Sequence, residues 1–421
     1  MKVLWFSPVP LSAMCKELNL SPPFGGGWVE SMLQELSRHK EFEIAVAWAH
    51  RDLRTPRRFS KDGVQYYVMT DPGWLVRGQG VLRKVSNRLE PFLGNIRDRR
   101  ALAEAVAVVK DYNPDLIHVF GAEHGYGLVA SQVRQPTVIW IQGILDVYQC
   151  HYFGGMSYLG RFFRPSLWLN YLRVRSEATR EAEIFRNSRY FIGRTRWDAA
   201  HQARLQPHGC YYTVQDCMRA EFYYAIPWNR LSARDLIIYT TTSGALLKGT
   251  DVLINAVALL RTRSPNIQLR VAGLESTNPV ARRLVHLVAE LGIHEQVKFL
   301  GQLDAVQIVY ELQQARVFVL PSFIENNPNS LIEAQLVGTP TIAAFVGGVP
   351  DIVSDGETGL LFQAGDSSTL AAQIMRVLES DELATRLSNQ ARHVTHLRNS
   401  RSLIVRDLFE AYRNILETVR S

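Results

Sequence analysis

The sequence has little cysteine and no long apolar run. Its 421 residues include four cysteines, none of them in a C-x-x-C pair, which argues against a disulfide framework or a zinc knuckle and favours a reducing compartment. No apolar stretch reaches the length of about 18 residues that a membrane-spanning helix needs. The opening MKVLWFSPVP lacks the long apolar core of a signal peptide. We therefore expect a cytoplasmic protein.

Acidic residues are outnumbered by basic ones in the first half of the chain. Residues 1–230 hold 30 lysines and arginines against 21 aspartates and glutamates, whereas residues 231–421 hold 17 against 19. The basic half suits an anionic membrane, a nucleic acid or a phosphorylated ligand, and it equally suits an ordinary solvated surface. Charge alone leaves these interpretations open.

Segments typical of strands alternate with helical patterns along the chain. A length of 421 residues, of which 47% are hydrophobic, allows two domains of about 200 residues each. We predict two doubly wound α/β domains with parallel sheets, one over 1–228 and one over 229–401. A last amphipathic helix, 402–421, has no strand after it and is expected to pack on the first domain. Beyond the N-terminal KVLWF, strands are predicted at 42–49, 64–70, 115–120, 136–143, 189–195, 236–244, 267–273, 297–301 and 315–322, and helices near 99–111, 166–186 and 250–263.

Two glutamates follow the last of these predicted strands. Glu325 lies in the loop after the strand, and Glu333 lies about one turn into the helix that Asn329 and Ser330 start. The N-terminus of such a helix offers free N–H groups and a partial positive charge to phosphate oxygens. A carboxylate on the helix can accept both hydroxyls of a ribose, and one in the loop can orient the hydroxyls of a sugar. The alternative for both residues is helix capping and salt bridges.

The residues around this pair resemble family 4 glycosyltransferases, which are retaining enzymes of the GT-B fold, with two Rossmann-like domains facing across a cleft. The resemblance rests on Pro321-Ser322, the E-x7-E spacing, GGVPD at 347–351 and DGETGLLFQAGD at 355–366. It implies that Glu333 holds the ribose of a nucleotide and that Glu325 is a catalytic residue holding the transferred sugar.

The turn between the two glutamates departs from the family pattern. Asn326, Asn327 and Asn329 replace the usual glycine-rich run, and their side chains add donors and acceptors. By resemblance this turn, together with Ser330 and Leu331, is assigned to donor binding through its main-chain N–H groups. The sugar's identity is left open.

A second segment, TTTSGALLKGTDVLINA at 240–256, resembles the family's diphosphate-binding loop. Lys248 matches the lysine of that loop and would stabilise the charge that develops on the leaving diphosphate. Ser243, followed by Gly244, stands where the family usually has arginine. A hydroxyl without charge implies a loss of about 2–4 kcal/mol of transition-state stabilisation unless another basic residue contributes. The alternative for Lys248 is an exposed lysine at a helix start.

Glycines at two further places are assigned to the donor by resemblance. Gly26 and Gly27, in the triplet that opens the first helix, would border the leaving phosphate or the acceptor. A flexible loop is the alternative, because the triplet is not a G-x-G-x-x-G fingerprint. Gly301, at the end of a strand, falls where family members bring the backbone against the nucleobase.

Polar residues at strand ends of the first domain are the candidates for acceptor binding. Gln142 and Gly143 stand where many family members have His-Gly, and Gln142 would position the sugar by hydrogen bonds. His124 lies past a strand end and is the candidate catalytic histidine. Arg194 and Arg196 are expected to contact an acidic or phosphorylated acceptor, with helix capping and a surface ion pair as the alternative.

The resemblance implies a hexosyl or N-acetylhexosaminyl transfer from a UDP- or GDP-sugar to a glycan or lipid-linked glycan. No D-x-D motif is present, so neither a metal ion nor another cofactor is expected. In retaining enzymes of this fold the leaving phosphate is thought to take the acceptor's proton. Two alternatives are a nucleotide-sugar-binding protein without transfer activity and a GT-B epimerase of nucleotide sugars.

The segment 151–180 interleaves aromatic residues, leucines and arginines. Such a segment suits a peripheral contact with the inner face of an anionic membrane, which would place the protein beside a lipid-linked acceptor. An ordinary helix packed on the core is the alternative. We do not expect nucleic acid as a partner.

Overall fold

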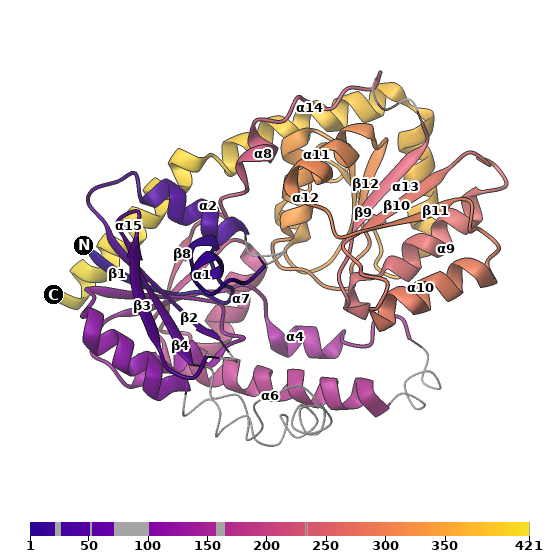
Figure 1. Cartoon of the computed structure of the whole chain (residues 1–421). Helices are drawn as coiled ribbons and strands as arrows, with labels where there is room; N and C mark the ends of the chain where they lie inside the picture. The colour runs from indigo at the N-terminus through magenta and orange to yellow at the C-terminus, as the bar shows by residue number, and fades with distance from the viewer. Residues whose placement is uncertain are drawn as a thin grey trace. The chain divides into compact units, whose positions relative to one another are not determined.

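The chain folds into two α/β units, each built around its own sheet (Figure 1). The division between Cys217 and Met218 precedes the predicted boundary near residue 228. Trp228 explains the difference, because its backbone N–H bonds to Val337 O at 2.9 Å and its ring N–H to Ala315 O at 2.7 Å, within the second unit. The computed structural model describes residues 1–21, 27–50, 53–70, 101–156, 165–231, 233 and 235–420. The first unit comprises Met1–Gln149, Tyr158–Cys217 and Arg401–Ser421, and the second comprises Cys150–Ser157 and Met218–Ser400.

The first unit contains an eight-stranded sheet in the order β3-β4-β2-β1-β5-β6-β7-β8. All neighbouring strands are parallel except β3 and β4. Side chains of a strand alternate between the two faces of a sheet, so Val3 and Trp5 of β1 join one core while Leu4 and Phe6 join the other. The strands are β1 (Lys2–Phe6), β2 (Glu43–His50), β3 (Arg57–Lys61), β4 (Val64–Thr70), β5 (Leu116–Phe120), β6 (Thr137–Trp140), β7 (Tyr190–Gly193) and β8 (Cys210–Thr213).

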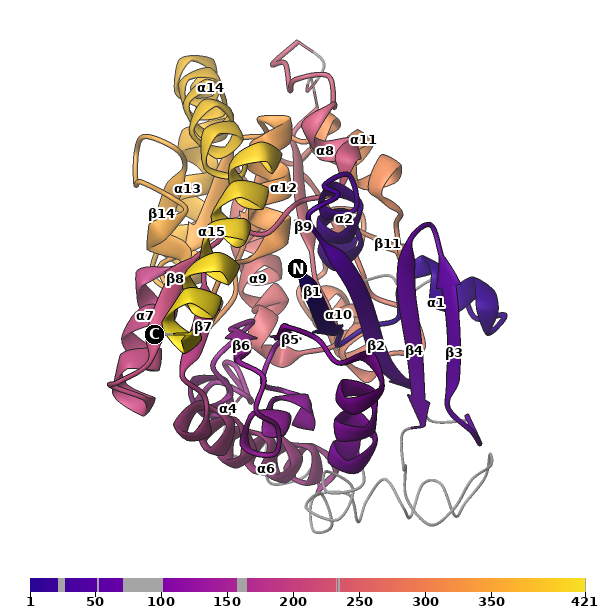
Figure 2. The ribbon, with the colours of Figure 1, turned by 90° about the vertical axis from the view of Figure 1, so that its left-hand side faces the viewer.

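Strand β3 lies outside the predicted pattern, as does β8. It pairs antiparallel with β4 at the edge of the sheet, where Figure 2 shows the two strands side by side. Asp62 and Gly63 form the turn between them, with φ angles of 51° and 79°. An Asp-Gly pair between two strands is a strong hairpin signal, because both turn positions need positive φ.

The C-terminal helix α15 (Arg401–Arg420) packs on the first unit beside α2 (Gly27–Leu36). Tyr412 of α15 is fully buried, and its hydroxyl accepts a hydrogen bond from Trp5 Nε1 at 3.1 Å. The same hydroxyl contacts His118, and burial lowers the pKa of that imidazole. The last helix of the chain thus completes the core of the first unit. The other helices of this unit are α1 (Ser12–Glu17), residues 101–112, the 3₁₀ helix η1 (Gly125–Ser131), α4 (Leu145–Cys150), α6 (Pro165–Asn187) and α7 (Arg196–Leu205).

The second unit contains a six-stranded parallel sheet in the order β11-β10-β9-β12-β13-β14. The chain runs outward from β9 through β10 and β11, and then returns to the other side of β9 with β12. The loops that follow β9 and β12 therefore diverge, and ligands of open α/β sheets bind at such a switch point. The strands are β9 (Ile237–Thr241), β10 (Gln268–Ala272), β11 (Val297–Gly301), β12 (Val317–Leu320), β13 (Thr341–Ala344) and β14 (Leu360–Phe362).

Helices cover both faces of this sheet and bury two hydrophobic clusters. In the helix after β12, α12 (Asn329–Val337), every residue from Leu331 to Val337 is buried. None of the helices in the described ranges has the length and apolarity needed to cross a bilayer. The other helices of the unit are α8 (Ala220–Tyr223), η2 (Leu246–Lys248), α9 (Thr250–Leu260), α10 (Pro279–Glu290), α11 (Ala305–Gln314), η3 (Val349–Asp351), α13 (Ser367–Glu379) and α14 (Asp381–Arg398).

Candidate functional site

The side chains of Glu325 and Lys248 are in contact at the switch point of the second sheet, where the loops after β12 and β9 begin. Lys248 Nζ donates to Glu325 Oε1 at 2.7 Å, and the two side chains are 30% and 8% exposed. Ser322 Oγ donates to the same oxygen at 2.7 Å. The carboxylate is thereby held by a charged and a neutral donor, while 30% of the lysine side chain stays exposed.

The two loops are held together by close backbone contacts that only glycine permits. Phe323 N donates to Leu247 O at 2.8 Å, which joins the loop after β12 to the loop after β9. Gly249 has a φ of 62°, and a Cβ atom there would clash with Pro321 O. Gly347, with a φ of 49°, lies in the same way against Glu325 O. The position of Glu325 is therefore set by backbone geometry on two sides.

The N-terminus of α12 is not capped by a side chain. Pro328 is the N-cap residue and has no side-chain group that can accept a hydrogen bond. No described residue accepts a hydrogen bond from the N–H groups of Asn329 or Ser330, and the buried Asn329 Oδ1 has no described partner. Asn326 and Asn327 are buried in the preceding turn. Free N–H groups and the helix dipole make this turn suited to an anion.

Glu333 lies on α12 and pairs with an arginine that sequence reasoning missed. Arg219 Nη2 donates to Glu333 Oε1 at 2.9 Å, and the side chains are 27% and 11% exposed. Burial raises the pKa of Glu333, while Arg219 acts in the opposite direction. Arg219 precedes Glu333 by 114 residues and belongs to no local motif, so only the fold brings the two together.

The other predicted donor residues of this unit lie at the same edge of its sheet. Ser243 and Gly244 are exposed after β9, and a Cβ on Gly244 would meet the side-chain nitrogen of Asn278. Gly301 ends β11 with a φ of 71°, and its carbonyl accepts from Gly273 N at 2.7 Å. Leu331 is fully buried, which leaves only its backbone for a ligand. Their roles in donor binding remain predictions.

Arg194 of the first unit is part of a buried network. Its guanidinium pairs with Asp216, and these side chains are 2% and 0% exposed. It also donates to Gln142 Oε1 at 3.2 Å and to the carbonyl oxygens of Ile141 and Gln142 at 2.7 and 3.0 Å. The alternative predicted for Arg194 was an ion pair at the surface. That location is wrong, because the pair with Asp216 is buried inside the unit. The described contacts of Arg194 are structural, so acceptor binding by this residue remains a prediction only.

The remaining predicted residues of the first unit differ in their surroundings. Gly143 lies against the ring of Tyr148, where a Cβ atom would be tightly crowded. Arg196 is exposed as the first residue of α7. Gly27 opens α2, whereas Gly26 lies outside the described residues.

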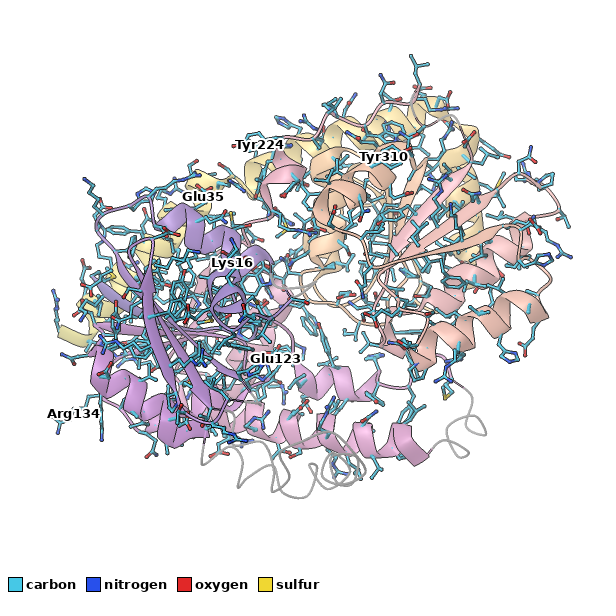
Figure 3. All side chains as sticks on the ribbon, viewed as in Figure 1. Lys16, Glu35, Glu123, Arg134, Tyr224 and Tyr310 are labelled. Carbon is cyan, nitrogen blue, oxygen red and sulfur yellow. The ribbon has the colours of Figure 1, made fainter. Side chains whose placement is uncertain are left out.

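An acidic residue lies next to the candidate histidine in the sequence. His124 is exposed after β5, with its ring 5.8 Å from that of Tyr126. Glu123, labelled in Figure 3, lies across Gly121, beside the side chain of Gln142. Burial raises the pKa of Glu123 to about 7, and the nearby Arg194 counteracts part of this effect. Glu123 is therefore a group that titrates near neutral pH.

Comparison with solved structures shows that the fold is GT-B. The chain is similar to sucrose-phosphate synthase from Thermosynechococcus elongatus, with a TM-score of 0.76 and 20% identity over 99% of this chain and 100% of that one. It is also similar to HepE from Anabaena in complex with UDP-glucose, with a TM-score of 0.67 and 16% identity over 98% of this chain and 100% of that one.

The similarity to a family model lies within the second unit. Residues 230–394 match the family model described as glycosyl transferases group 1. D-inositol 3-phosphate glycosyltransferase of Corynebacterium efficiens is 36% identical over 155 residues, and the protein of that name from Streptomyces coelicolor is 36% identical over 151. These matches span 36% and 34% of this chain, and only 36% and 33% of the relatives' own length.

Proposed function

We propose that this chain is a glycosyltransferase that moves a hexose or N-acetylhexosamine from a nucleotide sugar to a hydroxyl acceptor, with retention of configuration and without a metal ion. The main support is the Lys248–Glu325 pair, which lies at the switch point of the second unit close in sequence to the uncapped start of α12. A cation and free N–H groups suit a diphosphate, and a fixed carboxylate suits sugar hydroxyls. UDP-glucose is the first donor to test, since the similar HepE structure contains it.

In the proposed reaction the bond between the sugar C1 and a diphosphate oxygen breaks. A bond from the acceptor oxygen to C1 forms on the same face, and the acceptor's proton passes to the departing diphosphate oxygen. Lys248 stabilises the negative charge that develops on the diphosphate. Glu325, held by Ser322, orients the hydroxyls of the sugar, while Glu333 holds the ribose. No side chain of the protein is required to take the proton.

The acceptor is proposed from two independent observations. The basic first half of the chain and its aromatic, arginine-rich segment favour a lipid-linked glycan at the cytoplasmic face of a membrane. The names of the relatives favour a phosphorylated cyclitol, D-inositol 3-phosphate. Both acceptors offer hydroxyls, and transfer assays with each acceptor in turn distinguish them.

A thermal-shift screen with UDP-, GDP- and ADP-sugars tests the donor site. A donor at 100 times its Kd stabilises the folded state by about 2.7 kcal/mol, which raises Tm. We expect one nucleotide class to raise Tm and Glu333→Ala to abolish the shift. The absence of a shift with every donor would refute the proposed site.

Product analysis then separates transfer from the alternatives. Release of nucleotide only with acceptor, and a product of unchanged anomeric configuration in the presence of EDTA, support the proposal. Binding of donor without turnover indicates a binding protein. Interconversion of the donor sugar without acceptor indicates an epimerase.

A further inference from the structure

Arg219 has a fixed position beside the carboxylate of Glu333. It is the N-cap residue of α8, and α8 packs against α12, the helix that bears Glu333. Its guanidinium carbon lies 4.9 Å from the centre of the ring of Phe222, which is fully buried. A cation over an aromatic face is attracted to it and loses freedom. The ring of Phe222 in the same helix therefore orients the guanidinium that pairs with the carboxylate of Glu333.

The helix that bears Arg219 is itself anchored within the second unit. Met218 is 1% exposed and belongs to the cluster that includes Leu331 and Ile332 of α12. Tyr223 Oη donates to Asn399 O at 2.6 Å. The distance between the guanidinium and Glu333 is thus set by packing on both sides rather than by two flexible side chains.

Among the described residues, hydrogen bonds reach one carboxylate oxygen of Glu333. Arg219 donates to Oε1, and no residue that the structure describes donates to Oε2. The side chain is 11% exposed, so solvent or a ligand retains access to it. A carboxylate oxygen can accept more than one hydrogen bond, which suits two neighbouring hydroxyls.

We propose that Arg219 is a positioning residue of the donor site: it holds Oε1 of Glu333 and leaves Oε2 to accept hydrogen bonds from the ribose of a nucleotide. This inference rests on the proposed function, since it assumes that a nucleotide sugar binds beside α12. The alternative arrangement, in which ribose displaces Arg219 from Glu333, predicts an effect of opposite sign and is separated by the experiment below.

Electrostatics give the role of Arg219 a second signature. Burial raises the pKa of Glu333, Glu221 of α8 raises it further, and Arg219 lowers it. The buried hydroxyl of Tyr239 on β9 also interacts with Glu333, and burial raises the pKa of this tyrosine. Removal of Arg219 therefore raises the pKa of Glu333. More of the carboxyl is then protonated at mildly acidic pH, and a protonated carboxyl is a weaker acceptor for ribose hydroxyls.

The test measures UDP affinity by calorimetry between pH 6 and 8. We expect Arg219→Met to weaken binding about tenfold at pH 7.5, as the loss of a charged hydrogen bond predicts. The ratio of variant to wild-type Kd should grow as the pH falls towards 6, whereas titration of UDP itself affects both proteins equally. Arg219→Lys should restore most of the affinity, because it keeps the charge. If Arg219→Met does not fold, Arg219→Gln replaces it, with the same pH dependence expected.

A matched control is Arg270→Met. Arg270 forms a comparable half-buried pair with Glu311 at 2.9 Å in the same unit, and it does not contact Glu333. We expect this variant to bind UDP within twofold of wild type at every pH. Unchanged or tighter binding in Arg219→Met overturns the inference, as does a loss that is independent of pH. If wild type binds no nucleotide, the proposed function fails instead, so the two failures are distinct.

Discussion

Each unit has a basic residue after the carboxyl end of a strand, Arg194 after β7 and Lys248 after β9, but the surroundings of the two charges differ. In the second unit, Lys248 keeps 30% of its side chain exposed and meets a carboxylate beside free helix N–H groups. In the first unit, Arg194 is 2% exposed and its guanidinium donates to a carboxylate, an amide oxygen and two carbonyls. A charged residue at a strand end is thus a candidate ligand contact only where its donors remain accessible. In the first unit, burial raises the pKa of the nearby Glu123 carboxyl.

The largest expected effect is a loss of stability in the first unit. Arg194→Met removes the ion pair between Arg194 and the buried Asp216, and breaking a buried ion pair typically costs about 3–5 kcal/mol. Urea unfolding should show this loss. The double variant Arg194→Met/Asp216→Asn should regain much of it, since no uncompensated charge remains. If Arg194→Met is as stable as wild type, the buried ion pair does not stabilise the first unit, and the proposed difference between Arg194 and Lys248 is refuted.

Lys248→Ala tests whether the basic residue of the second unit acts in transfer rather than in stability. We expect transfer to fall by about 100- to 1000-fold, because the charge on the departing diphosphate loses its cation. Stability should fall by less than in Arg194→Met, since the Lys248 side chain is partly exposed and Ser322 still donates to Glu325. Single-turnover rates and thermal unfolding measure the two properties. An unchanged rate would show that the pair with Glu325 is structural.

A smaller, pH-dependent effect is expected at Glu123. Its pKa in the folded protein is raised from 4.5 to about 7, so ionisation destabilises the fold as pH rises through this range. Glu123→Gln removes that cost and should stabilise the protein at pH 8 by at most roughly 3 kcal/mol, but hardly at pH 5. Thermal unfolding at both pH values measures the difference. Glu17→Gln, which neutralises an exposed carboxylate of the same unit, is the matched control.

The smallest effect is expected at the predicted phosphate loop. Ser243 is exposed, so Ser243→Arg can add a cation without disturbing the core. We expect UDP to bind up to about fivefold more tightly, roughly 1 kcal/mol, if the loop contacts the diphosphate. Ser243→Gln, which adds bulk without charge, is the control. Equal affinities in all three proteins would place the diphosphate elsewhere.

Much of the fold follows from local sequence patterns. The buried strands β5 and β9 were predicted because they read as continuous apolar runs, as parallel strands covered on both faces do. The Asp62-Gly63 turn contains enough information to predict β3, but the strand's exposed, charged residues gave no apolar signal. Strand β13, with four residues, was missed because its pairing with β12 is a long-range property.

The sequence by itself determined that Glu325 follows a strand and that Glu333 lies in the next helix, because eight residues of local geometry suffice for that. It also determined the alternation of strands and helices. Only the tertiary structure decided which partner each carboxylate has: Lys248 for Glu325, and the distant Arg219 for Glu333. It likewise decided that Arg194 is buried. Partner choice depends on packing between segments far apart in the chain, which no local pattern specifies.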